Sequence, residues 1–108
     1  MASDPVAALS LRPRVIDAIC TVYDPEIPVN IHELGLIYDI EIDSARNVRI
    51  RMTLTAPACP SAQELPLEVE RTVGQVPGVA GVTVEVVWEP PWTADRMSDA
   101  AKLQLGML

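Results

Sequence analysis

The residues Thr53 to Leu65, TLTAPACPSAQEL, join a predicted strand to a predicted helix through a cysteine. Upstream, apolar residues alternate with arginine and threonine from Val48 to Thr55, and this period of two indicates a strand with one buried face. Ala56-Pro57 ends the strand. Because Pro60 suits the first position of a helix, Cys59 is the predicted N-cap of that helix.

The position of Cys59 predicts a reactive thiol. A sulfur at an N-cap faces free backbone N–H groups and the positive end of the helix dipole, so its thiolate is favoured. The alternative is a small buried hydrophobic residue, as most free cysteines are. We favour the functional thiol because Cys59 lies at a strand-to-helix junction. The second cysteine, Cys20, lies among apolar residues at helical spacing, and we interpret it as buried and unreactive.

The composition fits a single domain spanning residues 1–108, of which 49% are hydrophobic and none is phenylalanine. A net charge of -7 leaves no basic stripe for phosphate contacts, which argues against nucleic acid or an anionic membrane as partner. Residues 1–9, which we expect to form a flexible tail, carry no export signal, and no apolar run is long enough to span a membrane. We therefore expect a cytoplasmic protein with reduced cysteines.

The spacing of the apolar residues and the positions of the prolines predict two helices and a last strand. The first helix is predicted to begin at Ser10, a favourable N-cap, with Pro13 in its first turn. The helix that starts at Pro60 meets Pro66 within two turns, where we expect a kink or a break. Alternating valines from residue 82 to residue 88 predict the last strand.

The whole pattern predicts an α+β fold. Strands Leu36–Ile42 and Val48–Thr55 should pair as an antiparallel hairpin around a polar turn. The solvent face of this hairpin would carry Arg49 and Arg51, opposite acidic residues of the first strand, Asp39 or Glu41. The order helix, hairpin, helix, strand indicates a small mixed three-stranded sheet with helices on one face, followed by a C-terminal helix from Asp99 to Leu105.

The loop before the hairpin gathers three carboxylates, Asp24, Glu26 and Glu33, and is stiffened by two prolines. Either these are solvated surface acids, or the loop presents one or two of them beside Cys59, where they could accept hydrogen bonds or bind a metal. The sequence leaves both interpretations open. His32 lies in the same loop, and without a Cys or His at ligand spacing we expect it to be solvated.

Residues 89–108 follow the last strand and contain Trp92 and two adjacent prolines. We interpret them as a lid over the open side of the core or as a segment that docks partners, and we favour the lid. The part from Glu89 to Met97 should fold back over the sheet edge or over the junction at Cys59.

Four motifs, in this order, resemble the SufT branch of the metal-sulfur cluster biosynthesis family, which also includes the PaaD-like proteins. The resemblance extends from about Arg12 to Leu108. The motifs are Asp24-Pro25-Glu26-Ile27-Pro28-Val29-Asn30-Ile31, Glu33-Leu34-Gly35-Leu36-Ile37-Tyr38-Asp39, Thr53-Leu54-Thr55-Ala56-Pro57-Ala58-Cys59-Pro60 and Trp88-Glu89-Pro90-Pro91-Trp92-Thr93.

This resemblance implies a fold related to iron–sulfur assembly domains and a role in maturing or delivering iron–sulfur clusters, not the catalysis of a known reaction. The reactive cysteine of the family falls on Cys59, its acidic loop pair on Asp24 and Glu26, and its threonine hydroxyl on Thr55. It therefore implies that iron or an iron–sulfur cluster is bound transiently, with these residues as its binding and metal-ligating groups. Ala58 departs from the glycine that relatives often have before the cysteine.

Three functions stay open. In the first, the chain is a non-enzymatic assembly factor whose partners are the iron–sulfur assembly machinery and recipient apoproteins. One thiolate cannot supply four-cysteine coordination, so a homodimer, a small thiol or a client protein would complete the site. In the second, Cys59 is the nucleophile of a thiol enzyme, for which only His32 offers a base. In the third, the chain is a pure adaptor in which the cysteine is dispensable.

Overall fold

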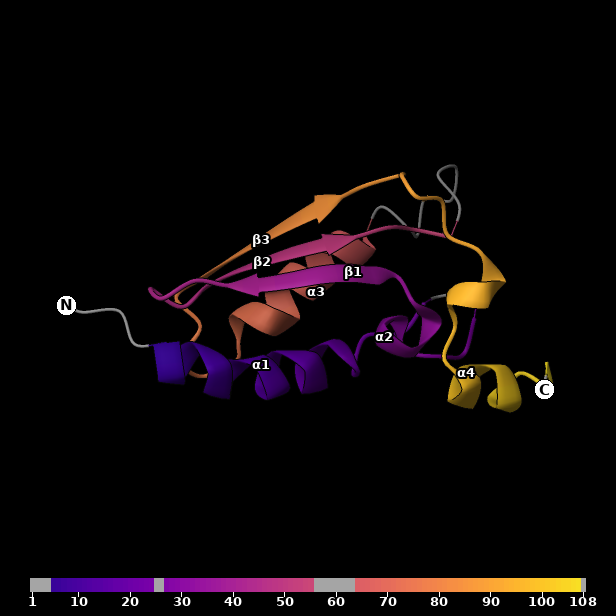
Figure 1. Ribbon diagram of the computed structural model, residues 1–108, viewed down its shortest axis with the longest axis horizontal. Coiled ribbons are helices and arrows are strands. Elements are labelled where there is room, and N and C mark those ends of the chain that lie inside the picture. The colour runs from indigo at the N-terminus through magenta and orange to yellow at the C-terminus, as the bar shows by residue number, and fades with distance from the viewer. Residues whose placement is uncertain (1–4, 25–26, 56–63, 108) are drawn as a thin grey trace.

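The structure is a computed structural model that describes residues 5–24, 27–55 and 64–107. Within them the chain has the predicted α+β fold, a small mixed sheet with helices packed on one face (Figure 1). The elements are α1 (Pro5–Ile19), α2 (Ile31–Leu34), β1 (Ile37–Ile42), β2 (Asn47–Met52), α3 (Leu65–Gly74), β3 (Gly81–Val86), the 3-10 helix η2 (Ala94–Arg96) and α4 (Asp99–Gln104).

The sheet has the strand order β1-β2-β3, with β2 in the centre. β1 and β2 are antiparallel, with Ile40 opposite Ile50. β2 and β3 are parallel, with Ile50 opposite Val84 and Met52 opposite Val86. Because parallel neighbours need a crossover connection, α3 is the element that returns the chain to begin β3 beside β2. The carboxyl ends of β2 and β3 consequently lie together at one end of the sheet.

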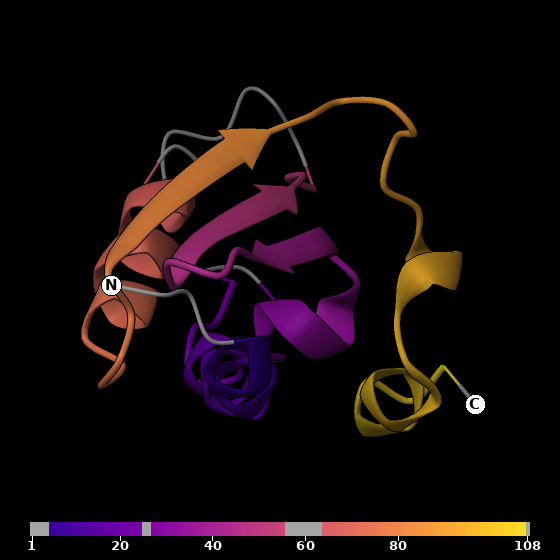
Figure 2. The same ribbon diagram turned by 60° about the vertical axis from the view of Figure 1, so that its left-hand side comes forward.

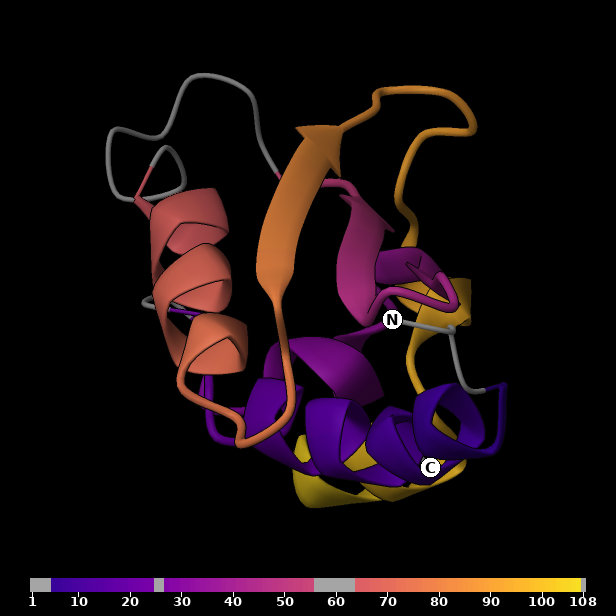
Figure 3. The same cartoon turned by 90° about the vertical axis from the view of Figure 1, so that its left-hand side faces the viewer.

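One face of the sheet is covered and the other is open. Figure 2 shows α1 and α3 on the same side of the sheet, and Figure 3 shows α3 alongside β3 with α1 crossing below. The alternation predicted for β2 is confirmed, since Val48, Ile50 and Met52 are buried while Arg49 and Arg51 are exposed. The fully buried side chains of the covered face include Val15, Ile19, Val48, Ile50, Met52, Val69 and Val73.

The first helix begins earlier than the sequence predicts. α1 starts at Pro5, within the predicted tail, so Ser10 is not its cap and Pro13 lies inside the helix. A proline inside a helix removes one backbone hydrogen bond, but packing of an apolar face stabilises most helices in proteins. In α1 that face carries Leu11, Val15 and Ile19, all buried.

The second long helix has Pro66 at its beginning and not two turns into it. α3 starts at Leu65, and Pro66 lies in its first turn, where a missing N–H has no partner to lose. Pro66 therefore helps to begin α3 and does not bend it. The predicted helix start at Pro60 lies outside the described residues.

The arginines of β2 pair with a different strand from the one predicted. Arg49 and Arg51 both contact Glu85 of β3, at N–O distances of 3.6 and 3.2 Å. The predicted register is confirmed, since Asp39 lies opposite Arg51 and Glu41 opposite Arg49, but in the described residues the ion pairs of both arginines are with Glu85 and not with these acids. In the parallel register Glu85 lies directly opposite Arg51 on the same open face, and its carboxylate reaches both guanidinium groups.

The C-terminal segment, residues 88–107, runs from the end of β3 to the opposite edge of the sheet, where it lies beside α2 and the start of β1 (Figure 1). α4 forms as predicted. Ser98 caps it by accepting a hydrogen bond from the Ala101 N–H at 3.1 Å, and Gly106 follows its end with a φ of 75°. The expectation that residues 89–97 fold back over an edge of the sheet is met at the β1 edge, where the Tyr38 hydroxyl donates to the Pro90 carbonyl at 2.7 Å, and Trp92 Nε1 donates to the Leu34 carbonyl of neighbouring α2 at 2.8 Å.

Candidate functional site

The predicted thiol belongs to the connection that follows β2. Past the end of β2, the Thr53 N–H donates to the Leu36 carbonyl and the Val87 N–H donates to the Met52 carbonyl, both at 2.8 Å. The chain then passes through Thr55 into residues 56–63, which lie outside the described residues and include Cys59. The N-cap position and the reactivity of Cys59 therefore stay predictions.

Two threonines lie at this end of β2. Thr55, the predicted site hydroxyl, is half-buried in a bend. Thr53, which strand alternation places on the solvent face, is instead fully buried, and within the described residues its Oγ1 has no hydrogen-bond partner. The alternation does not continue here because β2 ends at Met52, and Thr53 and Leu54 after it are both buried. Sequence reasoning missed Thr53, and only its place in the same motif as Cys59 could have drawn attention to it.

Asp24 is not a solvated surface acid. It lies after α1 with 7% of its surface exposed, and its Oδ1 accepts a hydrogen bond from the Ile27 N–H at 3.1 Å. The loop around it is fixed by an antiparallel bridge between Tyr23 and Asn30. The structure thus favours an ordered role for Asp24 in its loop. Glu26 lies outside the described residues, and the approach of either carboxylate to Cys59 stays a prediction.

The third carboxylate of the loop, Glu33, has a partner in the C-terminal segment. Asn30 caps α2 by accepting from the Glu33 N–H at 2.9 Å, and a side-chain oxygen of Glu33 accepts from the Ser98 hydroxyl. Neighbouring His32 lies in α2 and not in a loop. It is half-buried, and its Nδ1 is buried without a hydrogen-bond partner in the described part of the chain, so the expectation that His32 is solvated holds only in part.

Cys20 lies just past the end of α1 and is half-buried rather than buried. Burial raises the pKa of its thiol, and the negative charges of Glu33 and Asp17 raise it further. A raised pKa lowers the thiolate fraction at neutral pH, and the thiolate is the reactive form. The interpretation of Cys20 as an unreactive thiol is therefore supported by its surroundings.

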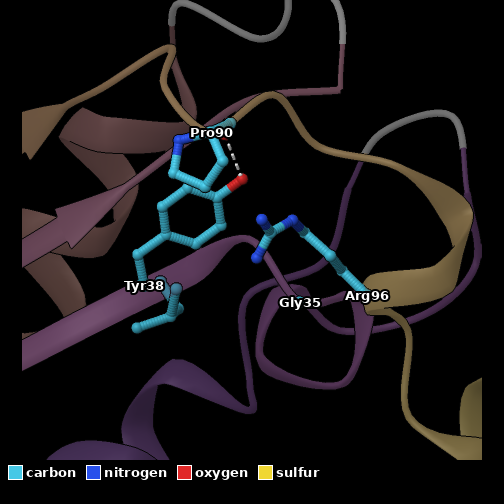
Figure 4. Close-up of a pocket in the computed structure, with 5 residues that line it drawn as sticks. Gly35, Tyr38, Pro90 and Arg96 are labelled. Carbon is cyan, nitrogen blue, oxygen red and sulfur yellow. Dashed lines mark hydrogen bonds between the residues drawn. The ribbon is translucent and has the colours of Figure 1, made fainter.

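An open pocket of about 450 Å³ lies where the C-terminal segment passes β1 (Figure 4). Tyr38 stands at its wall, and its hydroxyl donates to the Pro90 carbonyl at 2.7 Å. The Arg96 guanidinium lies over the Tyr38 ring, 4.7 Å from the ring centroid. Gly35 has a φ of 83°, and a Cβ there would collide with the Arg96 carbonyl group, so only glycine permits this approach. Sequence reasoning did not single out Arg96.

The described residues contain no group of three or more His, Cys, Asp or Glu side chains that could hold a metal ion. Across the same residues, no helix is both long and apolar enough to cross a membrane. The predicted ligand set of Cys59, Asp24 and Glu26 includes two residues that the structure does not describe. Asp24 and Thr55 are thus the only members of the predicted site whose places are known.

The chain is similar to known proteins over nearly its whole length. A family model described as "Iron-sulfur cluster assembly protein" matches residues 12–86. An Fe-S protein maturation auxiliary factor of Porphyromonas gingivalis is 46% identical over 100 residues, which cover 93% of this chain and 95% of that protein. The Fe-S protein maturation auxiliary factor SufT of Staphylococcus aureus is 37% identical over 86 residues, 80% of this chain and 98% of that protein.

A solved structure agrees with these relatives. The crystal structure of a domain of unknown function, DUF59, from Bacillus anthracis superimposes with a TM-score of 0.87 and 36% identity, covering 97% of this chain and 100% of that one. The resemblance to the SufT branch is thus confirmed by sequence and by fold. The chain belongs to the iron–sulfur cluster assembly protein family.

Proposed function

We propose that the chain is a non-enzymatic, cytoplasmic maturation factor that holds iron or an iron–sulfur cluster transiently through Cys59 and passes it to recipient proteins. The observation that carries the proposal is family membership over nearly the whole chain, with relatives named as Fe-S protein maturation auxiliary factors. The iron or cluster is cargo in this proposal and not a resident cofactor.

The topology supports Cys59 as the cargo-holding residue. In sheets with parallel strands, ligands bind beyond the carboxyl ends of the strands. The carboxyl ends of β2 and β3 lie side by side, and residues 56–63 leave from the end of β2. The buried Thr53 hydroxyl and the half-buried Thr55 lie at the same end.

The carboxylates Asp24 and Glu26 are proposed to assist the thiolate as oxygen ligands. An oxygen ligand is more weakly matched to iron–sulfur clusters than a thiolate is, so the resulting site would be labile. Lability suits a carrier, because the recipient protein must be able to replace the ligands of the cargo. A second chain, a small thiol or the recipient would complete the coordination.

Anaerobic reconstitution with iron and sulfide tests the proposal. We expect the wild-type chain to acquire visible absorbance that the Cys59→Ala variant lacks, whereas Cys20→Ala, the matched control, should behave as wild type. Equal absorbance in the Cys59→Ala variant would refute the role of this thiol. Thiol-dependent turnover without metal would instead support an enzyme, and complementation of a deletion strain by Cys59→Ala would support a pure adaptor.

The two thiols should also differ in reactivity. The pKa of Cys20 is raised by burial and by Glu33 and Asp17, so at neutral pH alkylation of the native chain should label Cys59 first. Labelling of Cys20 should become faster as the pH rises toward and beyond the ordinary thiol pKa. Mass spectrometry of peptides after timed alkylation measures both rates, and preferential labelling of Cys20 at pH 7 would contradict the assignment.

A further inference from the structure

The pocket at the β1 edge contains a guanidinium group, that of Arg96, which no acidic side chain of the described residues neutralises. Its lining residues are Gly35, Ile37, Tyr38, Pro90 and Arg96, none of which is acidic. Within the described residues, the Arg96 side chain makes no hydrogen bond and no ion pair, and its one recorded contact is with the Tyr38 ring. By contrast, Arg49 and Arg51 share the carboxylate of Glu85.

The contact with Tyr38 fixes the guanidinium without using its donors. A guanidinium that lies over a ring presents its N–H groups at its edges, in a planar fork that matches a carboxylate. The Tyr38 hydroxyl already donates its proton to the Pro90 carbonyl, so the pocket's side-chain donors are those of Arg96. Figure 4 shows the guanidinium reaching over the pocket toward the hydroxyl end of Tyr38.

Beside its polar groups, the pocket has an apolar wall. Ile37, the Tyr38 ring and Pro90 line the pocket together with Arg96, and the volume of about 450 Å³ is within the range of about 300–1,000 Å³ for ligand pockets. A bare inorganic anion would leave most of this apolar surface uncovered. A carboxylate attached to an apolar group would satisfy Arg96 and cover the apolar wall together.

We propose that this pocket binds a short segment of a partner protein that carries one carboxylate next to an apolar side chain. The net charge of the chain explains why the bound segment should carry only one carboxylate. A net charge of -7 would repel a segment with several acidic residues, whereas a single carboxylate can pair with the guanidinium of Arg96. The partner belongs to the iron–sulfur assembly machinery or to its recipients, and in this the inference rests on the proposed function.

An NMR titration of the full ¹⁵N-labelled chain tests the pocket. The probe is acetyl-leucyl-glutamyl-leucinamide, which has one carboxylate between two apolar side chains, and its neutral counterpart carries glutamine in place of glutamate. We expect saturable shifts of the Gly35 and Tyr38 amides and of the Arg96 Nε–H with the glutamyl peptide, and no saturable shift with the glutaminyl peptide. Because the pocket is open, binding should be weak, in the millimolar range.

Matched variants connect the shifts to Arg96. Arg96→Gln should weaken binding on the order of tenfold, the size of one charge-assisted hydrogen bond. Arg96→Lys keeps the positive charge but loses the planar set of N–H donors, so its affinity for the glutamyl peptide should lie between those of Arg96→Gln and wild type. Arg71→Gln should change nothing, because Arg71 shares its pocket with Glu64 and Glu68.

Three outcomes would overturn the inference: equal binding of the two peptides, shifts confined to the Arg49 and Arg51 face of the sheet, or phosphate producing the same shifts as the glutamyl peptide. Resonances of the buried core confirm that each variant is folded. Cluster reconstitution should be unchanged in Arg96→Gln. Loss of reconstitution with Cys59→Ala and loss of peptide binding with Arg96→Gln are therefore separate results, and either proposal can fail alone.

Discussion

The helix-and-sheet core and the C-terminal segment are held in place by different interactions. In the core, α1 and α3 cover the sheet with side chains that are fully buried, such as Val15, Ile50 and Val69. The C-terminal segment buries only Met97 and Ala101. Three more of its apolar side chains, Trp92, Ala94 and Leu105, pack partly buried against the core, and hydrogen bonds attach the segment to α2, to the start of β1 and to the loop before α2.

This difference predicts two levels of stability within one small chain. Burial of apolar surface is shared among many neighbours, so the core should unfold as one unit. The C-terminal segment buries far fewer apolar side chains than the core does, and its hydrogen bonds each contribute only about 0.5–1.5 kcal/mol, so it should open locally at a lower free energy. A segment that opens while the core stays folded suits either of the roles predicted for it, lid or docking segment.

The largest expected effect is in the core. Ile50, at the centre of β2, is fully buried, and Ile50→Ala should lower the free energy of unfolding by about 3–4 kcal/mol through lost burial and a cavity. Denaturant unfolding followed by circular dichroism measures the change. Thr83→Ala, on the exposed face of β3, is the control and should change stability by less than about 0.5 kcal/mol. Similar effects of the two variants would mean that the core is not organised around β2.

The next effect concerns the junction between the two regions. Gly35→Ala should cost about 3 kcal/mol, because it combines a left-handed backbone with a collision against the Arg96 carbonyl group. Gly106→Ala is the matched control: its φ is also positive, at 75°, but nothing lies within 4 Å of the added Cβ, so only about 1 kcal/mol of backbone strain is expected.

Amide hydrogen exchange shows which region of the chain each glycine variant destabilises. Gly35→Ala should speed exchange at the Ser98 N–H, which donates to the Glu33 carbonyl at 2.8 Å. Exchange in β2 should change little, because the core does not depend on the C-terminal segment. If both glycine variants cost the same, or if β2 opens together with the segment, the two regions form one cooperative unit.

The core is also the part that the sequence predicts well. The hairpin and the last strand are both present, and the period of two around Ile50 in β2 matches its burial on one face. In β3 the alternation of the sequence is not matched by burial, because all its residues except exposed Thr83 are half-buried. The helix ends were predicted less well. Local rules favoured Ser10 as a cap and Pro66 as a break, but tertiary packing carries α1 through Pro13, and Pro66 takes the first turn of α3.

The contacts of the candidate site could not be predicted from the sequence, because they join distant positions. No local pattern shows that Glu85 is opposite Arg51 or that Arg96 lies over Tyr38, since a parallel register and the path of the C-terminal segment set these contacts. The sequence singles out Asp24 as a candidate site residue, but its burial depends on the fold of the loop and could not be predicted. The roles of Cys59 and Glu26 stay predictions.

A smaller effect is expected within the C-terminal segment. Trp92→Phe keeps an aromatic ring but removes the N–H that donates to the Leu34 carbonyl at 2.8 Å, and it should cost about 1 kcal/mol. The loss should appear as faster exchange in α4 and η2 with little change in the midpoint of global unfolding. A full shift of the global midpoint would show that the segment belongs to the core.

The smallest effect is expected on the open face of the sheet, which neither burial nor the C-terminal segment covers. Glu85→Gln removes the carboxylate shared by Arg49 and Arg51, whose side chains are 53% and 45% exposed. Exposed ion pairs contribute about 0.2–1 kcal/mol and are screened by salt, so the loss should be below about 1 kcal/mol and should shrink further in 1 M salt. Urea unfolding at low and high salt measures the loss of stability and its dependence on salt, and Arg51→Gln with the double variant completes a double-mutant cycle.

The coupling energy from that cycle tests the ranking. If it exceeded the cost of Trp92→Phe and persisted in high salt, charge pairing would rank above the attachment of the C-terminal segment as a source of stability. The expected order of core, junction, segment and open face would then be wrong at its last step.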